Sequence, residues 1–208
     1  MSRNMPSAVR QHALQIAHHE MGHYVVARSL GFATGGVSLT VTMDLRHHGG
    51  AAITLARPLA SMAVMKAHLE ARMMVLFAGV MAQTLSSAGV DKSKAIAILK
   101  GALGAEHDYA KIKELQHLLR NISYPETDPA SAERIANELK TVTDRVWDRT
   151  QAIVEAQADT IIELGRMLVD GMAIVEEWGR AADTYEVVFS RDRLERLPAI
   201  QAISLLGT

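Results

Sequence analysis

Three residues near the amino terminus have the types and the spacing of a hydrolytic zinc site. His19, Glu20 and His23 form the pattern His-Glu-x-x-His within a stretch whose apolar residues recur at helical spacing. Four residues correspond to about 400° of helical rotation, so the two imidazoles stack one turn apart and can bind one Zn²⁺ ion. Glu20 lies about 100° round the helix, where it can take a proton from a metal-bound water. The pattern therefore predicts a zinc-dependent hydrolase with Glu20 as its catalytic base.

Two histidines and a water leave a tetrahedral zinc ion short of one protein ligand. The longer pattern His-Glu-x-x-His-x-x-Gly-x-x-His is excluded, because Val26 and Ser29 occupy the positions of its glycine and its last histidine. The third ligand must then come from farther along the chain, and spacing alone does not choose it. The candidates are Glu70, Glu106, His107 and Asp108.

The elements that position these residues are expected to be helices with one small β-hairpin. Apolar residues keep helical spacing from residue 8 to residue 30, and Gly31 follows as a helix stop. Residues 37–42 alternate apolar and polar side chains, which is typical of a half-buried strand, and a polar turn joins them to a second strand that ends near Leu55. Further helices are predicted at 59–86, 92–103 (stopping near Gly104), 105–121 and 130–169, with a break from Tyr124 to Pro129.

The predicted fold class is mainly α with a small β-hairpin or sheet. A chain of 208 residues suits one domain. Residues 1–123 hold the zinc-site helices and the hairpin, and residues 124–183 form a long helical segment that packs on them within the same domain. Residues 184–208 form a tail to which no pattern assigns a structure.

Composition excludes several other classes of protein. The chain has no cysteine, which excludes disulfides and thiolate zinc sites. Its net charge is −1 and it has no block of Lys and Arg, so no nucleic-acid partner is expected. No apolar run reaches the roughly 18–20 residues that span a bilayer, and no signal peptide is recognisable. We therefore expect a cytoplasmic protein without a membrane span.

The helix that carries the zinc pattern also resembles a known family. Its segment Ile-Ala-His-His-Glu-Met-Gly-His-Tyr-Val-Val, from Ile16 to Val26, resembles the zinc-site helix of the FtsH-type, AAA-linked metalloproteases, including the glycine before the second histidine. The likeness continues in order over roughly residues 10–170. It includes the 37–55 hairpin, the small-residue segment from Leu76 to Ala82, the segment from Gly104 to Tyr109 and the 130–169 helix.

The resemblance implies a fold, a ligand set and an activity. The fold would be that of the helical FtsH-type peptidase domain, and Asp108 would be the third ligand of a Zn²⁺ cofactor. The implied activity is hydrolysis of peptide bonds by a metal-activated water, with a polypeptide as substrate. We expect residues 37–42 to offer a strand edge on which an extended peptide could pair.

The chain departs from the family in three respects. Family members carry an ATPase module before this domain, whereas no Gly-x-x-x-x-Gly-Lys-Ser/Thr motif occurs here, so a separate ATPase or self-association is the partner to consider. Val80 stands where the family has arginine, and Gln83 where it has glutamate. These departures leave a non-catalytic zinc-containing partner or regulatory module as the alternative function. Two further alternatives are a protease that cleaves one specific repressor and a metal-free helical scaffold.

Three other histidines have simpler interpretations. His18 is expected to be only a neighbour of the zinc pattern on its helix. His47 and His48 lie in the predicted hairpin turn, where solvated polar side chains are usual.

Overall fold

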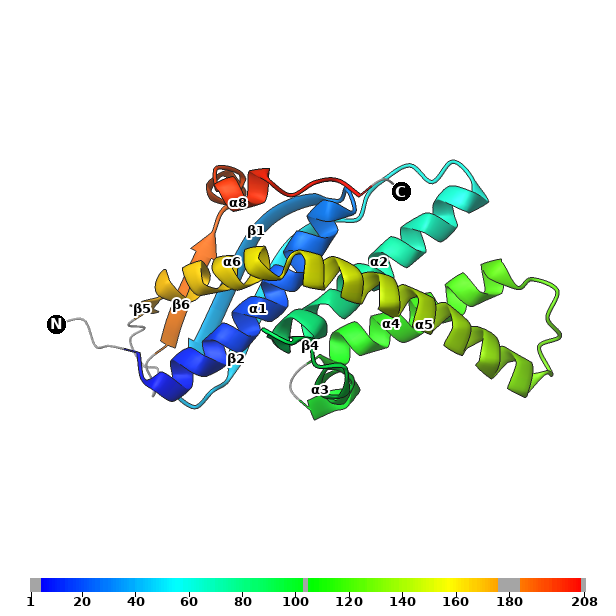
Figure 1. The fold of residues 1–208 in the computed structure, drawn as a ribbon, viewed down its shortest axis with the longest axis horizontal. Coiled ribbons are helices and arrows are strands. Elements are labelled where there is room, and N and C mark those ends of the chain that lie inside the picture. Colours follow the sequence, from blue (N-terminus) through cyan, green and yellow to red (C-terminus); the bar gives the residue numbers. More distant parts are fainter. Residues whose placement is uncertain (1–4, 103–104, 176–183, 207–208) are drawn as a thin grey trace.

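The computed structural model describes residues 5–102, 105–175 and 184–206 of the chain. It is mainly helical with a small antiparallel sheet, which confirms the predicted class (Figure 1). In chain order the elements are α1 (Ser7–Ser29), β1 (Ala33–Thr42), β2 (His47–Thr54), α2 (Met62–Gln83), β3 (Leu85–Ser86), β4 (Gly89–Val90), α3 (Lys92–Ala97), a π-helical turn (Ile98–Ala102), α4 (Glu106–Ser123), α5 (Ala132–Ala156), α6 (Ala158–Asp170), β5 (Ala173–Val175), β6 (Thr184–Phe189), α7 (Arg191–Glu195) and α8 (Pro198–Gln201).

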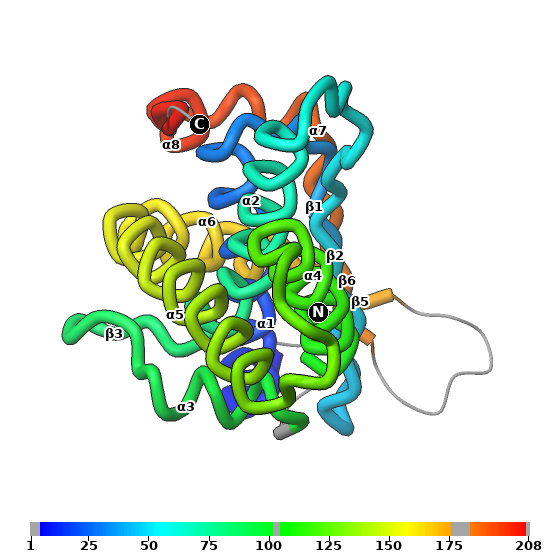
Figure 2. Tube along the Cα trace, turned by 90° about the vertical axis from the view of Figure 1, so that its right-hand side faces the viewer, coloured from blue at the N-terminus to red at the C-terminus, as the bar shows by residue number. Residues whose placement is uncertain are grey.

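Helix α1 lies at the centre of the molecule. The sheet lies on one side of it, α2 runs alongside, and α5 and α6 lie on the side away from the sheet (Figure 2). This position explains why α1 lacks a clean polar face: its residues Met21 and Tyr24 through Ala27 are all fully buried. A helix enclosed on several sides is held rigidly by packing, which suits an element that must fix two imidazole rings.

Helices α1 and α2 approach each other closely at Gly22. A Cβ atom at this position would lie 2.5 Å from the Ala78 carbonyl oxygen and 2.5 Å from the Ala82 Cβ. Small residues on both helices therefore set the distance between them. The sequence contains this signal in the segment from Leu76 to Ala82, whose Ala78, Gly79 and Ala82 lie against α1.

The sheet has four strands in the order β2-β1-β6-β5, and all of its pairings are antiparallel. Strand β1 pairs with β2 on one side and with β6 on the other, so residues 37–42 are bonded along both edges. The prediction that they offer a free edge is wrong. The edge strand of this first hairpin is β2, which ends the sheet. Strand β6 comes from the tail to which the sequence assigned no structure.

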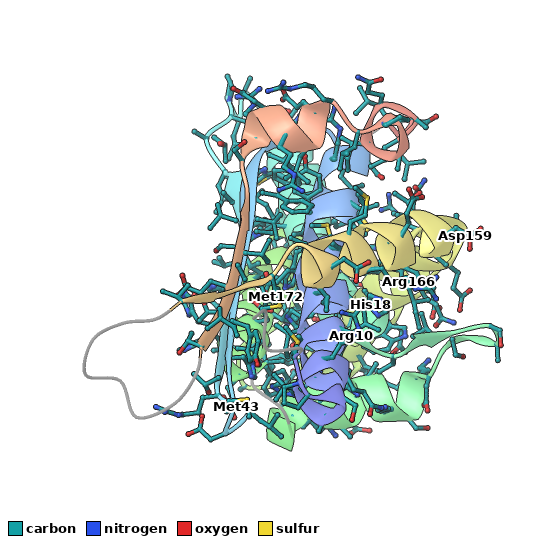
Figure 3. The ribbon with its side chains drawn as sticks, turned by 90° about the vertical axis from the view of Figure 1, so that its left-hand side faces the viewer. Arg10, His18, Met43, Asp159, Arg166 and Met172 are labelled. Carbon is teal, nitrogen blue, oxygen red and sulfur yellow. The ribbon has the colours of Figure 1, made fainter. Side chains whose placement is uncertain are left out.

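The single long helix predicted at 130–169 is divided into α5 and α6 at Gln157, whose φ and ψ are −105° and 13°. No glycine or proline marks this break. Tertiary packing explains it, because α6 turns to cross α1, where Gly165 lies against His18 (Figure 3). The helix predicted at 92–103 is shorter in the structure, where α3 ends at Ala97. Its expected stop at Gly104 lies outside the described residues. Residues 176–183 of the predicted 124–183 segment also lie outside them.

Within the described ranges, no helix combines the length and the apolar character that crossing a membrane requires.

The close crossing at Gly22 yields a test of the fold. Gly22→Ala is expected to lower the free energy of unfolding by about 1–3 kcal/mol, because the added carbon has no room against α2. Alanine stabilises a helix relative to glycine by about 1 kcal/mol. A net loss of stability in this variant must therefore come from the steric clash at the crossing. Gly50→Ala is the matched control, since its Cβ would meet only Ser38 Oγ at 4.0 Å. Urea unfolding of both variants measures the difference; an unchanged or raised stability of Gly22→Ala would refute the tight crossing.

Candidate metal centre

Three side chains from two distant parts of the chain converge on one point. The Nε2 atoms of His19 and His23 on α1 lie 3.0 Å apart. The Oδ2 atom of Asp108, in the first turn of α4, lies 3.0 Å from His23 Nε2 and 3.4 Å from His19 Nε2. Among the residues that the structure describes, these three form the one group of His, Asp or Glu side chains arranged to hold a metal ion. The structure thus brings together the predicted ligands.

The triangle of ligand atoms fits a zinc ion. Zinc binds imidazole nitrogen and carboxylate oxygen at about 2.0–2.2 Å, which places tetrahedral ligands about 3.3 Å apart. The three observed separations lie close to this value. Three protein ligands leave a fourth position for water, the usual arrangement of a catalytic zinc site.

Hydrogen bonds at the far nitrogens fix the orientation of both rings. His19 Nδ1 lies 3.1 Å from Gln83 Oε1, and His23 Nδ1 lies 2.7 Å from the carbonyl oxygen of Val75. Both partners are acceptors, so each ring donates its Nδ1 proton to α2 and turns its Nε2 atom toward the common point. Ligating histidines in metalloproteins are held in this way. Both acceptors are on α2, which therefore orients the site that α1 supplies.

Gly79 on α2 provides the space for the two rings. A Cβ atom there would lie 2.6 Å from His23 Nε2 and 2.7 Å from His19 Nε2. Any side chain would push the imidazoles from their present positions. Sequence reasoning noted a small-residue segment here but did not assign this role to Gly79, because the requirement appears only once the rings face α2.

Asp108 and His23 each shift the other's pKa. Burial alone would raise the pKa of Asp108, but hydrogen bonds to His19 and His23 hold it well below its ordinary value. Burial alone would lower the pKa of His23, but the hydrogen bond and the charge of Asp108, with the charge of Glu20, raise it. The carboxylate is therefore ionised and next to two imidazoles, as a metal ligand must be.

Glu20 lies beside the cluster but does not belong to it. Its side chain is buried, and it packs against Gly49 on β2, where a Cβ atom would lie 2.6 Å from Glu20 Oε1. Glu20 lines the same open pocket as the three ligands, of about 820 Å³. It makes no hydrogen bond with any residue in the described ranges. Its carboxylate is free to act on a molecule in the pocket.

The pocket is lined by residues of α1, β2, α2 and α4. Its lining includes Arg72 of α2 and Lys111 of α4. Burial lowers the pKa of Arg72, an effect that the nearby Asp108 carboxylate opposes. The guanidinium stays charged, because arginine does not lose its proton in proteins. The sequence did not single out Arg72, because a lone arginine on a helix usually lies on its solvent-facing side.

The other candidate ligands lie outside the cluster. Glu70 forms ion pairs with Arg145 and Arg149 of α5, which tie α5 to α2. Glu106 is exposed, and His107 is exposed at the edge of the pocket without joining the ligand group.

The remaining histidines have distinct surroundings. His18 is packed between α1 and α6 with Arg166 nearby, and burial followed by the charge of Arg166 lowers its pKa to about 4 (Figure 3). His47 Nδ1 lies 3.0 Å from Nε2 of His12, so His47 contacts α1 and is not merely solvated. His48 lines the pocket.

Comparison with known proteins assigns no family to this arrangement: no family model matches the sequence, and no curated protein matches it.

The geometry distinguishes Asp108 from its neighbour His107. Asp108→Ala is expected to weaken zinc binding by about 100-fold or more, because it removes one of three protein ligands. His107→Ala, one residue away, is the matched control and should bind zinc as the unaltered protein does. Zinc titration against a competing chelator measures both affinities. Loss of zinc binding in the His107 variant alone would show that the ligand assignment is wrong.

Proposed function

We propose that this protein is a zinc-dependent metallopeptidase. The observation that supports it most is the convergence of His19 Nε2, His23 Nε2 and Asp108 Oδ2, with the free carboxylate of Glu20 beside them in an open pocket. Zinc held by these three side chains would act as a Lewis acid, polarising a substrate carbonyl and lowering the pKa of water to about 7.

Glu20 is the proton carrier in this proposal. Its carboxylate takes a proton from the attacking water and passes it to the nitrogen of the departing amine, so that both halves of the reaction use one group. Its partial enclosure against Gly49 restricts its rotamers and keeps it beside the ligands. With zinc held at their Nε2 atoms, His19 and His23 would keep only their Nδ1 protons, which Gln83 Oε1 and the Val75 carbonyl oxygen accept.

Strand β2 is the part of the chain best placed to hold a polypeptide substrate. It ends the sheet, and residues 47–51 and Ile53 line the pocket. An extended peptide could pair with this edge through main-chain hydrogen bonds, which give affinity with little dependence on side chains. Such binding favours unfolded or flexible polypeptides as substrates.

The resemblance to FtsH-type peptidases supports the same function. The family's zinc helix and third-ligand segment correspond here to residues that meet at one point, which is what that domain requires. Gln83, which replaces a glutamate, still accepts the His19 ring hydrogen bond. Val80, which replaces an arginine, is fully buried and does not line the pocket. A separate ATPase, or self-association, is proposed as a partner that would deliver unfolded chains.

The alternative of a non-catalytic zinc module is less well supported. A zinc site with only a structural role needs no base, yet Glu20 lies within the pocket and has no hydrogen-bond partner among the described residues. A purely structural site is also usually closed by a fourth protein ligand, whereas here three are gathered.

Glu20→Gln separates the two functions. It should bind zinc as the unaltered protein does but cleave unfolded casein about 10²–10⁴-fold more slowly, because the general base is lost. Glu106→Gln, an exposed change at the start of α4, is the matched control and should leave cleavage unchanged. Peptide release with and without a zinc chelator measures both. Chelator-resistant cleavage, or full activity of Glu20→Gln, would contradict the proposal.

A further inference from the structure

Arg72 brings a cation into the pocket that no side chain neutralises by direct contact. It is half-buried on α2 and lines the pocket. Among the described residues it has no hydrogen bond and no ion pair. By contrast Arg46, also at the pocket, is paired with Asp44 at 2.8 Å. A partly desolvated guanidinium without a partner is costly to the fold, and an anionic ligand would offset that cost.

The pocket as a whole has an excess of positive charge available to a ligand. Lys111, one turn after Asp108 on α4, also lines it and has no ion pair within the described ranges. The pocket's two carboxylates are Glu20 and Asp108. Asp108 already faces two imidazoles, and a divalent cation at the cluster would offset both carboxylates. The charges of Arg72 and Lys111 would then remain for a substrate.

The position of Arg72 relates this charge to the proposed site of cleavage. Arg72, Leu76, Gly79 and Gln83 recur along one face of α2, and Gly79 lies directly against the two imidazoles. Seven residues separate Arg72 from Gly79, which is about 10 Å along the helix axis. An extended peptide advances about 3.3 Å per residue. A group held by Arg72 would therefore lie within about three residues of the scissile bond.

We propose that Arg72, assisted by Lys111, forms a carboxylate-binding subsite beside the metal centre and gives the enzyme a preference for substrates with a carboxylate near the cleaved bond. This inference rests on the proposed peptidase function. The planar fork of a guanidinium can bind both oxygens of a carboxylate at once. That carboxylate is either an acidic side chain or the carboxyl terminus of the peptide.

Arg72 could instead serve only to balance the charge of Asp108, which acts on it electrostatically. In that case its loss would alter zinc binding and slow all peptides alike. A subsite has a different signature, because its loss changes the ratio between charged and neutral peptides. This ratio is measured within one protein sample and does not depend on how much of a variant is folded.

The test uses decapeptides of Ala and Leu with one Glu or one Gln at each of the three positions on either side of the centre, with free or amidated carboxyl termini. We expect kcat/KM to favour the carboxylate by about tenfold or more at one position. A preference for Glu in amidated peptides identifies an acidic side chain, and a preference for free over amidated peptides, with cleavage within three residues of the carboxyl terminus, identifies the terminus.

Variants then assign the preference to its residues. Arg72→Met should reduce the ratio to about one, Arg72→Lys should retain part of it, and Lys111→Met should reduce it less. Lys113→Met, which removes the same charge from α4 outside the pocket, is the matched control and should leave the ratio unchanged. A preference that survives in Arg72→Met would overturn the subsite.

Binding of the same peptides to zinc-loaded Glu20→Gln protein separates the two proposals. Cleavage of neutral and charged peptides at equal rates would refute the subsite and leave the peptidase standing. Arg72-dependent binding of carboxylate peptides without any cleavage would support the subsite and refute the peptidase. Neither binding nor cleavage of any peptide would refute both.

Discussion

The site depends on a steric constraint between two helices. Two imidazoles one turn apart on α1 must fit against α2, and they do so because Gly79 has no side chain and Gly22 lets the helices approach. The same helix supplies the acceptors Gln83 and Val75, so one surface both makes room for the rings and orients them. A small increase in volume at this crossing would therefore disturb the two imidazole rings as well as the core.

The central position of α1 connects stability with function. The sheet, α2 and α6 all pack on it, which fixes the direction in which His19 and His23 point. Asp108 comes from α4, which packs on α2 and α5. The cluster is thus held by elements that are themselves fully packed, as preorganised sites require. Strand β2 and Glu20 also line the pocket.

The sequence allowed prediction of the features with local signals. Helix α1 has a periodic apolar pattern and the His-Glu-x-x-His motif, and the first hairpin has clear alternation, so both were found. Asp108 was singled out only by resemblance, because a ligand distant in sequence has no spacing rule. The division at Gln157 and the pairing of β6 depend on tertiary packing. Gly79 and Arg72 act through neighbours from other elements, and no local pattern reveals such roles.

The coordination of the bound metal tests the account most directly. Protein purified without a metal-affinity column should contain about one zinc ion per chain. X-ray absorption at the zinc edge should then show two imidazole nitrogens and additional oxygen ligands at about 2.0–2.2 Å. Absence of metal after incubation with zinc, or coordination without histidine, would contradict the claim that His19, His23 and Asp108 form a metal centre.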